Sequence, residues 1–431
     1  MNPQVAVIGI GADGAAGLRP EMIERIVHAD FLAGGERHLA HFPQARGERF
    51  VIRDNLASLL GELGRRYPEQ RCVVLASGDP LFHGVGRILL GSLGPEVLRI
   101  EPAVSSMQLA FARVGYPWEH AALGSVHGRD VRVNLLPLLG RGVIGLFTQD
   151  GDSPAAVARF FLERGLSGYK AVVGENLGAA AERVTRWPTL TNLAEQCFGP
   201  LNYLILLRTG LPWPDVERNR ALVPGVPDEA FARPDDGPEV MTRQEVRSVV
   251  LAKLLGSTDP GDTVWDIGAG LGTVSVEIAV LRPHLEVIAV ERDPARAVFL
   301  RQNRERFGAY NVRVVESSAP EALHAETQSP RLVFVGGSGG RLTDILTTVA
   351  ERLAAGCRLV ASFVTLEHLT LALESIRALK WPFEVTEVHI ARSDTLAGLT
   401  GLKPQRGVFL LRADKPSSGA QTIERGELVP R

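Results

Sequence analysis

Short apolar runs alternate with amphipathic stretches along the first half of the chain. An apolar run bounded by turn residues predicts a strand, and apolar positions spaced three or four apart predict a helix. The runs predict strands at residues 5–8, 72–76, 97–100, 142–147, 170–173 and 203–207. The amphipathic stretches predict helices at 20–28, 56–67, 105–114 and 155–164. Strands separated by helices indicate an α/β fold with largely parallel sheets.

The same alternation returns after residue 240. Strands are expected at 263–266, 286–290, 312–316, 331–335, 358–363, 384–391 and 407–411, with helices at 246–255, 273–281, 294–306, 342–353 and 366–379. Five strand–helix units followed by an antiparallel pair are the plan of a Rossmann-like methyltransferase. Thr242 and Glu245 precede the first of these helices at the spacing of a capping box, which would explain both residues without any ligand.

Residues 211–240 separate the two halves. Six prolines fall there among acidic residues and no periodicity survives, which predicts a linker or an arm laid over a surface. We therefore expect one domain at 1–210 and a second at 241–413. From Asp414 the chain is polar and patternless, and it ends in Leu428-Val429-Pro430-Arg431, the recognition stem of a tag-removal protease. We expect residues 414–431 to be a disordered tail with a tag remnant.

Composition narrows the class of protein. Hydrophobic residues make up 45% and the formal net charge is −2, so bulk charge attracts neither nucleic acid nor an anionic membrane. The three cysteines lie far apart, and the sequence has neither CxxC nor HExxH, so we expect no disulfide framework and no metal site. No apolar stretch is long enough to span a bilayer. These features predict a cytoplasmic protein.

A glycine-rich loop between a predicted strand and helix is the clearest chemical signal. Gly268, Gly270 and Gly272 let the backbone approach a nucleotide-like ligand closely. Their GxGxG spacing, with the carboxylate of Asp266 just before the loop, favours S-adenosylmethionine (SAM) over a dinucleotide. Glu291 ends the next strand, where it can accept both ribose hydroxyls of either ligand.

A second glycine loop follows the first strand of the chain. Gly9-Ile10-Gly11-Ala12-Asp13-Gly14 matches GxGxxG, which would indicate NAD with Asp30 as the ribose acid. Asp30, however, precedes the next apolar stretch instead of ending it, so the NAD alternative is the weaker one. Residues 75–80 and 102–106 read as a sharp turn and as a helix start that Ser105 or Ser106 would cap.

Together these segments resemble known families. Residues 7–11, Ser77-Gly78-Asp79-Pro80-Leu81-Phe82 and Pro102-Ala103-Val104-Ser105-Ser106 are similar to the tetrapyrrole (corrin/porphyrin) methylases. The second half resembles the decarboxylating precorrin methylases through residues 241–247, 266–272, 319–323 and Gly336-Gly337-Ser338-Gly339-Gly340. In this order they resemble the fused decarboxylating precorrin methyltransferases of cobalamin biosynthesis.

The resemblance implies two SAM sites on two unrelated folds. It implies methylation of a precorrin-6Y-type tetrapyrrole at C5 by the first domain. The second domain would methylate C15 and decarboxylate the C12 acetate, giving a precorrin-8X-type product. By position, SAM-binding residues are expected at Gly268, Ala269, Gly270, Leu271, Gly272, Glu291, Thr242, Ala319 and Asp266, and in the first domain at Gly78, Asp79, Ser105, Ser106 and Gly9. Ser317-Ser318 stands where relatives have Gly-Asp, so the adenine contact there is expected from a backbone group or a hydroxyl.

The substrate side is expected at Gly337, Ser338, Gly339 and Arg341, and no catalytic acid or base is assigned. Arg37, Arg243, Arg247 and Arg341 are candidates for binding the acetates and propionates of the substrate, and we expect a homo-oligomer. The alternatives left open are an NAD-dependent oxidoreductase, a methyltransferase acting on RNA, and a single-site methyltransferase whose first half only binds the corrinoid.

Overall fold

The computed structural model describes residues 5–67, 69–127, 130–210, 224–234, 241–396 and 399–417. These residues form two compact units: 5–131 with 141–210, and Arg132–Gly140 with 224–417. Of the expected arm at 211–240, residues 211–223 and 235–240 lie outside the described residues, as do 418–431 of the expected tail. The domain boundaries inferred from the sequence stay predictions.

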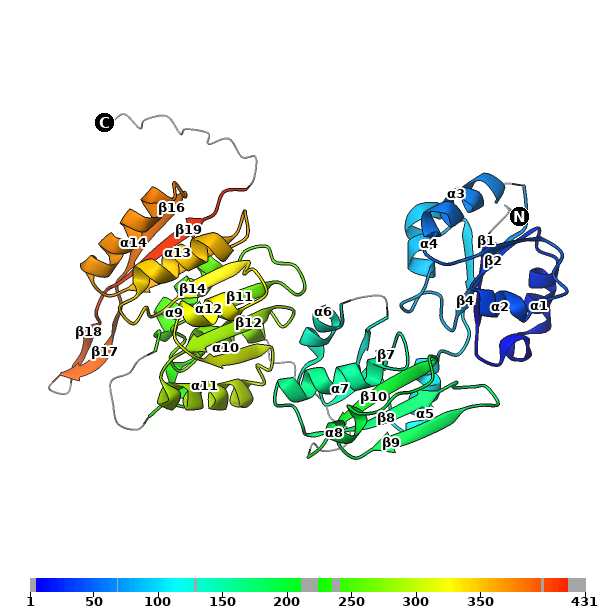
Figure 1. Cartoon of the computed structure of the whole chain (residues 1–431), viewed down its shortest axis with the longest axis horizontal. Helices are drawn as coiled ribbons and strands as arrows, with labels where there is room; N and C mark the ends of the chain where they lie inside the picture. Colours follow the sequence, from blue (N-terminus) through cyan, green and yellow to red (C-terminus); the bar gives the residue numbers. More distant parts are fainter. Residues whose placement is uncertain are drawn as a thin grey trace. The chain divides into compact units, whose positions relative to one another are not determined.

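The first unit contains a wholly parallel sheet of order β3-β2-β4-β1-β5 (Figure 1). Its strands are β1 (Val5–Ile10), β2 (Phe31–Gly34), β3 (Glu48–Val51), β4 (Cys72–Ser77) and β5 (Leu98–Glu101). Helices α1 (Pro20–Val27) and α2 (Glu36–Ala40) pack on one face, and α3 (Leu56–Arg66) and α4 (Gly86–Leu93) on the other. The carboxyl ends of β1, β2 and β4 therefore meet at one edge, which is where α/β folds bind ligands.

The second sheet of this unit corrects an expectation. Its order is β6-β7-β10-β8-β9, and only β6 and β7 run parallel. The strands are β6 (Ala122–Ser125), β7 (Val143–Phe147), β8 (Tyr169–Glu175), β9 (Arg183–Trp187) and β10 (Asn202–Arg208); the helices are α5 (Ser106–Val114), α7 (Ser153–Glu163) and α8 (Leu190–Leu193). Helix α6 (Val131–Leu135) belongs, apart from its first residue, to the segment Arg132–Gly140 of the second unit. The expectation of largely parallel sheets is wrong here because β8 returns directly into β9 without a crossover helix, and β10 then pairs antiparallel with both β7 and β8.

The second unit has the Rossmann-like plan that the sequence predicts. Its sheet has the order β13-β12-β11-β14-β15-β19-β16. The parallel strands are β11 (Thr263–Ile267), β12 (Glu286–Glu291), β13 (Val312–Glu316), β14 (Leu332–Val335) and β15 (Arg358–Phe363), and β19 (Val408–Asp414) pairs antiparallel with both β15 and β16 (Phe383–Val388). Helices α9 (Gln244–Leu254), α10 (Thr273–Leu281) and α11 (Pro294–Phe307) cover one face; α12 (Glu321–Ala325), α13 (Leu342–Arg352) and α14 (Leu366–Ala378) cover the other.

Three local expectations in this unit are wrong. Instead of one strand at 384–391, β16 ends at Val388, and β17 (Ala391–Leu396) and β18 (Leu399–Pro404) form a separate ribbon that projects from the sheet (Figure 1). No side chain caps α9: its N-cap is Arg243 and not the expected Thr242, and Glu245 pairs with Arg392 of the ribbon. Asp414 belongs to β19, where it pairs with Arg358.

Residues 224–234 of the expected arm pack onto the second unit. Phe231 is buried in the core beside α9, and the backbone N–H groups of Gly225 and Val226 donate to the carboxylate of Glu277. The buried Arg247 joins this segment to the domain through Asp228 and Glu277. Because each of these buried charges has an opposite charge beside it, the segment is held firmly against the sheet.

Candidate functional site

Two glycine loops lie against each other at the carboxyl edge of the second unit's sheet. Gly268 follows β11 with φ +70°, and a Cβ there would come within 2.3 Å of the carbonyl oxygen of Gly337. Gly336 N donates to Ile267 O at 2.9 Å, which joins the loop after β14 to the loop after β11. Only glycine allows both the left-handed backbone and this close approach.

Glu291 ends β12 beside the first loop. Its carboxylate accepts the N–H of Gly270 at 2.7 Å and the N–H of Asp293 at 2.9 Å, and the side chain is only 4% exposed. The two backbone bonds fix the carboxylate at the cavity wall, and each oxygen keeps a further lone pair for a hydroxyl donor. This geometry fits the ribose diol of an adenosine cofactor.

Asp266 lies beneath the loop and not in the cavity wall. It is fully buried and accepts a hydrogen bond from Ser275 through one oxygen, while the other oxygen has no partner among the described residues. Burial raises the pKa of this carboxyl to about 7, against the lowering effect of Ser275 and with a further raising effect of Glu291. Asp266 is therefore not placed to contact the ammonium group of a ligand in the cavity.

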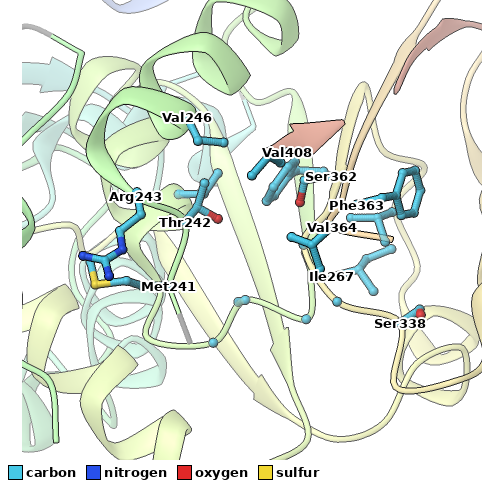
Figure 2. Close-up of a pocket in the computed structure, with 18 of the residues that line it drawn as sticks. Met241, Thr242, Arg243, Val246, Ile267, Ser338, Ser362, Phe363, Val364 and Val408 are labelled. Atoms are coloured by element: carbon cyan, nitrogen blue, oxygen red, sulfur yellow. The ribbon is translucent and has the colours of Figure 1, made fainter. Parts of the chain in front are cut away.

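The two loops open into a cavity of about 1190 Å³. Figure 2 shows Thr242 and Arg243 on one side of it, with Ser338, Phe363 and Val364 on the other. The expected site residues that line the cavity are Thr242, Gly268, Ala269, Gly270, Glu291, Ala319, Gly337, Ser338, Gly339 and Arg341. Asp266, Leu271 and Gly272 do not line it. Ser317 and Ser318, where the chain departs from its relatives, also face the cavity.

Gly272 and Leu271 have structural roles that explain this placement. Gly272 is the N-cap of α10 with φ +78°, and a Cβ there would lie 2.6 Å from Leu300 of α11. Leu271 is 4% exposed, and its carbonyl accepts the amide of Asn303. Both residues therefore fix the loop against α11.

Cationic side chains outnumber carboxylates around the cavity, and the sequence pattern did not predict most of them. Arg243 and Arg341 were expected. The others come from the loop after β12, the first turn of α11, the β17–β18 ribbon and the turn after it: Arg292, Arg296, Arg392, Lys403 and Arg406. The lining carboxylates are Glu291 and Asp394. The signal that could have found the ribbon residues is the concentration of basic side chains at 392–406, between two predicted strands.

Three of the expected arginines already have ion-pair partners. A guanidinium nitrogen of Arg243, which lines the cavity, lies 3.9 Å from the carboxylate of Asp228. Arg247 is fully buried and its guanidinium binds Glu277 and Asp228, so its assignment to the substrate is wrong. Arg341 lies at the start of α13, lines the cavity, and pairs with Glu321 and Asp344. Arg406 is exposed and has no hydrogen-bond or ion-pair partner among the residues that the structure describes. It is therefore available to an anionic ligand.

The expected site of the first unit is also brought together by the fold. A Cβ on Gly9 would lie 1.9 Å from the carbonyl oxygen of Gly78, and a Cβ on Gly78, with φ +55°, would lie 3.1 Å from Cα of Ser105. Ser105 caps α5 in a capping box with Gln108, so its hydroxyl is used within the helix. Asp79 accepts the N–H of Leu81 at 2.9 Å, which forms the expected turn. Ser106 is the first residue of α5.

The N-terminal GxGxxG loop lacks the context of a dinucleotide site. A 3₁₀ turn at Gly14–Gly17 follows it, and α1 begins only at Pro20, so no helix N-terminus faces the glycines. Asp30 precedes β2 and is bound by Arg71 through both oxygens, which holds the pKa of Asp30 at about 2. Neither feature supports NAD.

Fold and site together define a chain with a SAM-type nucleotide loop on a Rossmann-like sheet, joined to another α/β unit in which Gly9 and Gly78 pack closely. The model of tetrapyrrole (corrin/porphyrin) methylases matches residues 4–193, and that of the precorrin methyltransferase domain matches residues 230–415. A precorrin-6Y C(5,15)-methyltransferase [decarboxylating] of Sinorhizobium is 35% identical, over 94% of each chain. The chain therefore belongs to the family of precorrin-6Y C5,15-methyltransferases (decarboxylating).

Shorter relatives match single parts of the chain. The cobalt-precorrin-7 C(5)-methyltransferase of Salmonella typhimurium is 38% identical over 42% of this chain and 88% of its own length. The probable cobalt-precorrin-6B C(15)-methyltransferase (decarboxylating) of Pyrobaculum aerophilum is 36% identical over 44% of this chain and 95% of its own length.

Proposed function

We propose that this protein methylates a precorrin at C5 and at C15 with two molecules of SAM and removes the carboxyl group of the C12 acetate. The substrate is of the precorrin-6Y type and the product of the precorrin-8X type. The observation that carries the proposal is the cavity of the second unit, which Glu291 and the glycine loop line together with several cationic side chains. Its volume of about 1190 Å³ is above the usual range of small-molecule pockets, so it has room for a second ligand beside the cofactor.

The residues of this cavity divide by chemistry. Glu291, Gly268, Gly270, Ala319 and Thr242 would hold SAM, which supplies an electrophilic methyl group. Lys403, Arg406 and Arg243 would bind the ring carboxylates of the precorrin through charge-assisted hydrogen bonds. Fixing the ring at both ends places the electron-rich meso carbon for in-line attack, which is the main catalytic task in such a transfer.

The first unit would perform the other methylation, at C5. Gly9, Gly78, Asp79, Ser105 and Ser106 would bind SAM mainly through backbone groups. Support comes from the match of residues 4–193 to the tetrapyrrole methylases and from the existence of separate C(5)- and C(15)-specific relatives, each about as long as one half of this chain. We propose domains at 1–210 and 241–413, connected by the segment 211–240.

Product mass from the full-length chain tests the division of labour. In Gly268→Ala the added Cβ would meet the backbone of Gly337, and this variant should lose the C15 methyl and the decarboxylation. Gly78→Ala should lose only the C5 methyl. Gly308→Ala is the control, because Gly308 also has a positive φ, a Cβ there would come no closer than 3.9 Å to Tyr310, and the residue does not line the cavity.

The alternative of a passive first half predicts a different result. In that case Gly78→Ala would give the wild-type product, only more slowly. A product from the unmodified protein that lacks both added methyl groups would refute the proposed function altogether.

Three expectations remain predictions. They are homo-oligomeric assembly, a cytoplasmic location and the absence of a nucleic-acid partner. In the part of the chain that the structure describes, no helix is both long and apolar enough to cross a membrane, and no group of His, Cys, Asp and Glu could hold a metal ion.

A further inference from the structure

A polar cluster that has no part in the proposed cofactor site lies at the carboxyl edge of the first parallel sheet. His38, on the short α2 after β2, is only 8% exposed. Its Nε2 lies 3.1 Å from the hydroxyl of Ser77, the last residue of β4, and 3.3 Å from a guanidinium nitrogen of Arg37. Its Nδ1 is buried without a partner among the described residues.

The contacts determine which nitrogen of His38 is basic. Arg37 can only donate, so Nε2 is the nitrogen that carries a lone pair and Nδ1 carries the hydrogen. The hydroxyl of Ser77 then also donates to Nε2. Burial, followed by the charges of Arg37 and His41, lowers the pKa of His38 to about 4 and keeps the ring neutral near pH 7. The neutral ring is a weak base, so it suits the transient uptake of a proton from a strongly acidic cation and its prompt release.

Ser77 connects this histidine to the proposed C5 site. It is exposed and immediately precedes Gly78, whose Cα lies against Ser105 and whose carbonyl accepts the N–H of Ala103 at 3.1 Å. The hydroxyl is thus next to the close-packed glycines Gly9 and Gly78, and a buried neutral imidazole contacts it. Structural stability alone does not require this arrangement, since it leaves Nδ1 buried and unsatisfied at a cost.

We propose that Ser77 and His38 form a proton-accepting pair for the methylation at C5, an inference that rests on the proposed function. The C5 atom attacks the methyl group with a π electron pair of the ring, and the methyl–sulfur bond breaks with its electrons left on sulfur. C5 then carries both hydrogen and methyl, and the ring is cationic. The C5–H bond breaks, and its electron pair returns to the ring.

The released proton has a defined route in this pair. It passes to the Oγ of Ser77 while the hydroxyl hydrogen of Ser77 moves to Nε2 of His38. The imidazolium that results returns the proton to water. Ser77 is the catalytic residue in this scheme, and His38 is a positioning residue that acts through it.

Full-length variants test the pair. His38→Gln keeps a hydrogen-bond acceptor for Ser77 but cannot take up a proton, and Ser77→Ala removes the connection. In both we expect C5 methylation to slow by about 100-fold, the usual scale of a lost general base. C15 methylation, carbon dioxide release and SAM binding by the first unit should be unchanged. His28→Gln, at the exposed end of α1, is the control.

An isotope effect separates proton transfer from a merely structural role. The rate of C5 methylation is compared between substrate that carries deuterium at C5 and substrate that carries hydrogen there. His38→Gln should methylate the deuterated substrate more slowly, whereas the wild-type protein should methylate both at nearly the same rate. Wild-type C5 methylation in both variants, a parallel loss of SAM binding, or a loss of rate without the isotope effect would each overturn the inference. Failure of the unmodified protein to methylate C5 would instead overturn the proposed function.

Discussion

Glu291 is the residue on which the proposed cofactor site depends most. It is held by two backbone N–H groups and faces the cavity, so its charge is directed at one place. Glu291→Gln keeps the shape but weakens the acceptor. We expect SAM affinity of the second unit to fall by about 10- to 100-fold, as for the loss of charge-assisted hydrogen bonds.

Equilibrium titration with SAM would measure this loss. Glu316→Gln is a matched control, because Glu316 is the register partner of Glu291 on β13 but pairs with Arg301 at the surface. Equal weakening in both variants would contradict the role assigned to Glu291.

Asp266 should make the stability of the second unit depend on pH. Its pKa is raised from the ordinary 3.8 to about 7 in the folded state, so between these values the folded chain binds more protons than the unfolded chain. The stabilising effect of protonation is thus complete below pH 4 and is lost as pH rises through 7, with a total of up to about 4 kcal/mol.

Thermal unfolding between pH 5 and pH 8 checks this sign. The melting temperature of wild type should fall more across this range than that of Asp266→Asn, whose side chain is neutral throughout. Other titrating groups cancel in the comparison. An equal fall in the variant and in wild type would show that Asp266 is already ionised in the folded protein across this range.

At the scale of elements, the β17–β18 ribbon and the turn after it supply the cations that the strand pattern alone did not reveal. Arg392 is tied to Glu245 and Asp228, which anchors the ribbon, while Arg406 has no partner among the described residues. We therefore assign Arg392 to anchoring and Arg406 to the carboxylates of the substrate.

Arg406→Gln should raise the KM for the precorrin by about 10-fold, the scale of one charge-assisted contact, and leave SAM affinity unchanged. Arg377→Gln, on α14 and outside the cavity wall, should change neither. The KM should also rise with ionic strength in wild type and less so in Arg406→Gln, because salt screens exposed charges. A KM unchanged in Arg406→Gln would remove Arg406 from the substrate site.

For the whole molecule, the proposal of two folds with two sites predicts the binding stoichiometry. The full chain should bind two equivalents of SAM or of its demethylated product, and Glu291→Gln should leave one tight site. Calorimetric titration distinguishes this from a passive first half, for which wild type would bind one equivalent. The two proposed SAM sites lie on separate sheets, so we expect each to bind SAM independently of the other.

The local pattern of the sequence determined most of the elements and the principal loop. Apolar runs such as those of β1 and β11 predict strands of a buried sheet, and both form them. The GxGxG spacing predicts a tight loop, and Gly268 in it has the left-handed backbone that glycine allows. The Rossmann-like order of the second unit was predictable for the same reason. The antiparallel pairing of β10 was not, because an apolar strand carries no mark of the direction of its neighbour.

The tertiary structure alone decided which charges face a ligand. Arg247 and Arg406 are the same residue type, yet one is fully buried between two carboxylates and the other is exposed at the cavity. Asp266 is next to the last residue of β11 and Glu291 is the last residue of β12, yet only Glu291 reaches the cavity. The pairing of Ser77 with His38 joins two segments that no spacing connects. Burial and pairing depend on what packs against a side chain, and distant parts of the chain supply those neighbours.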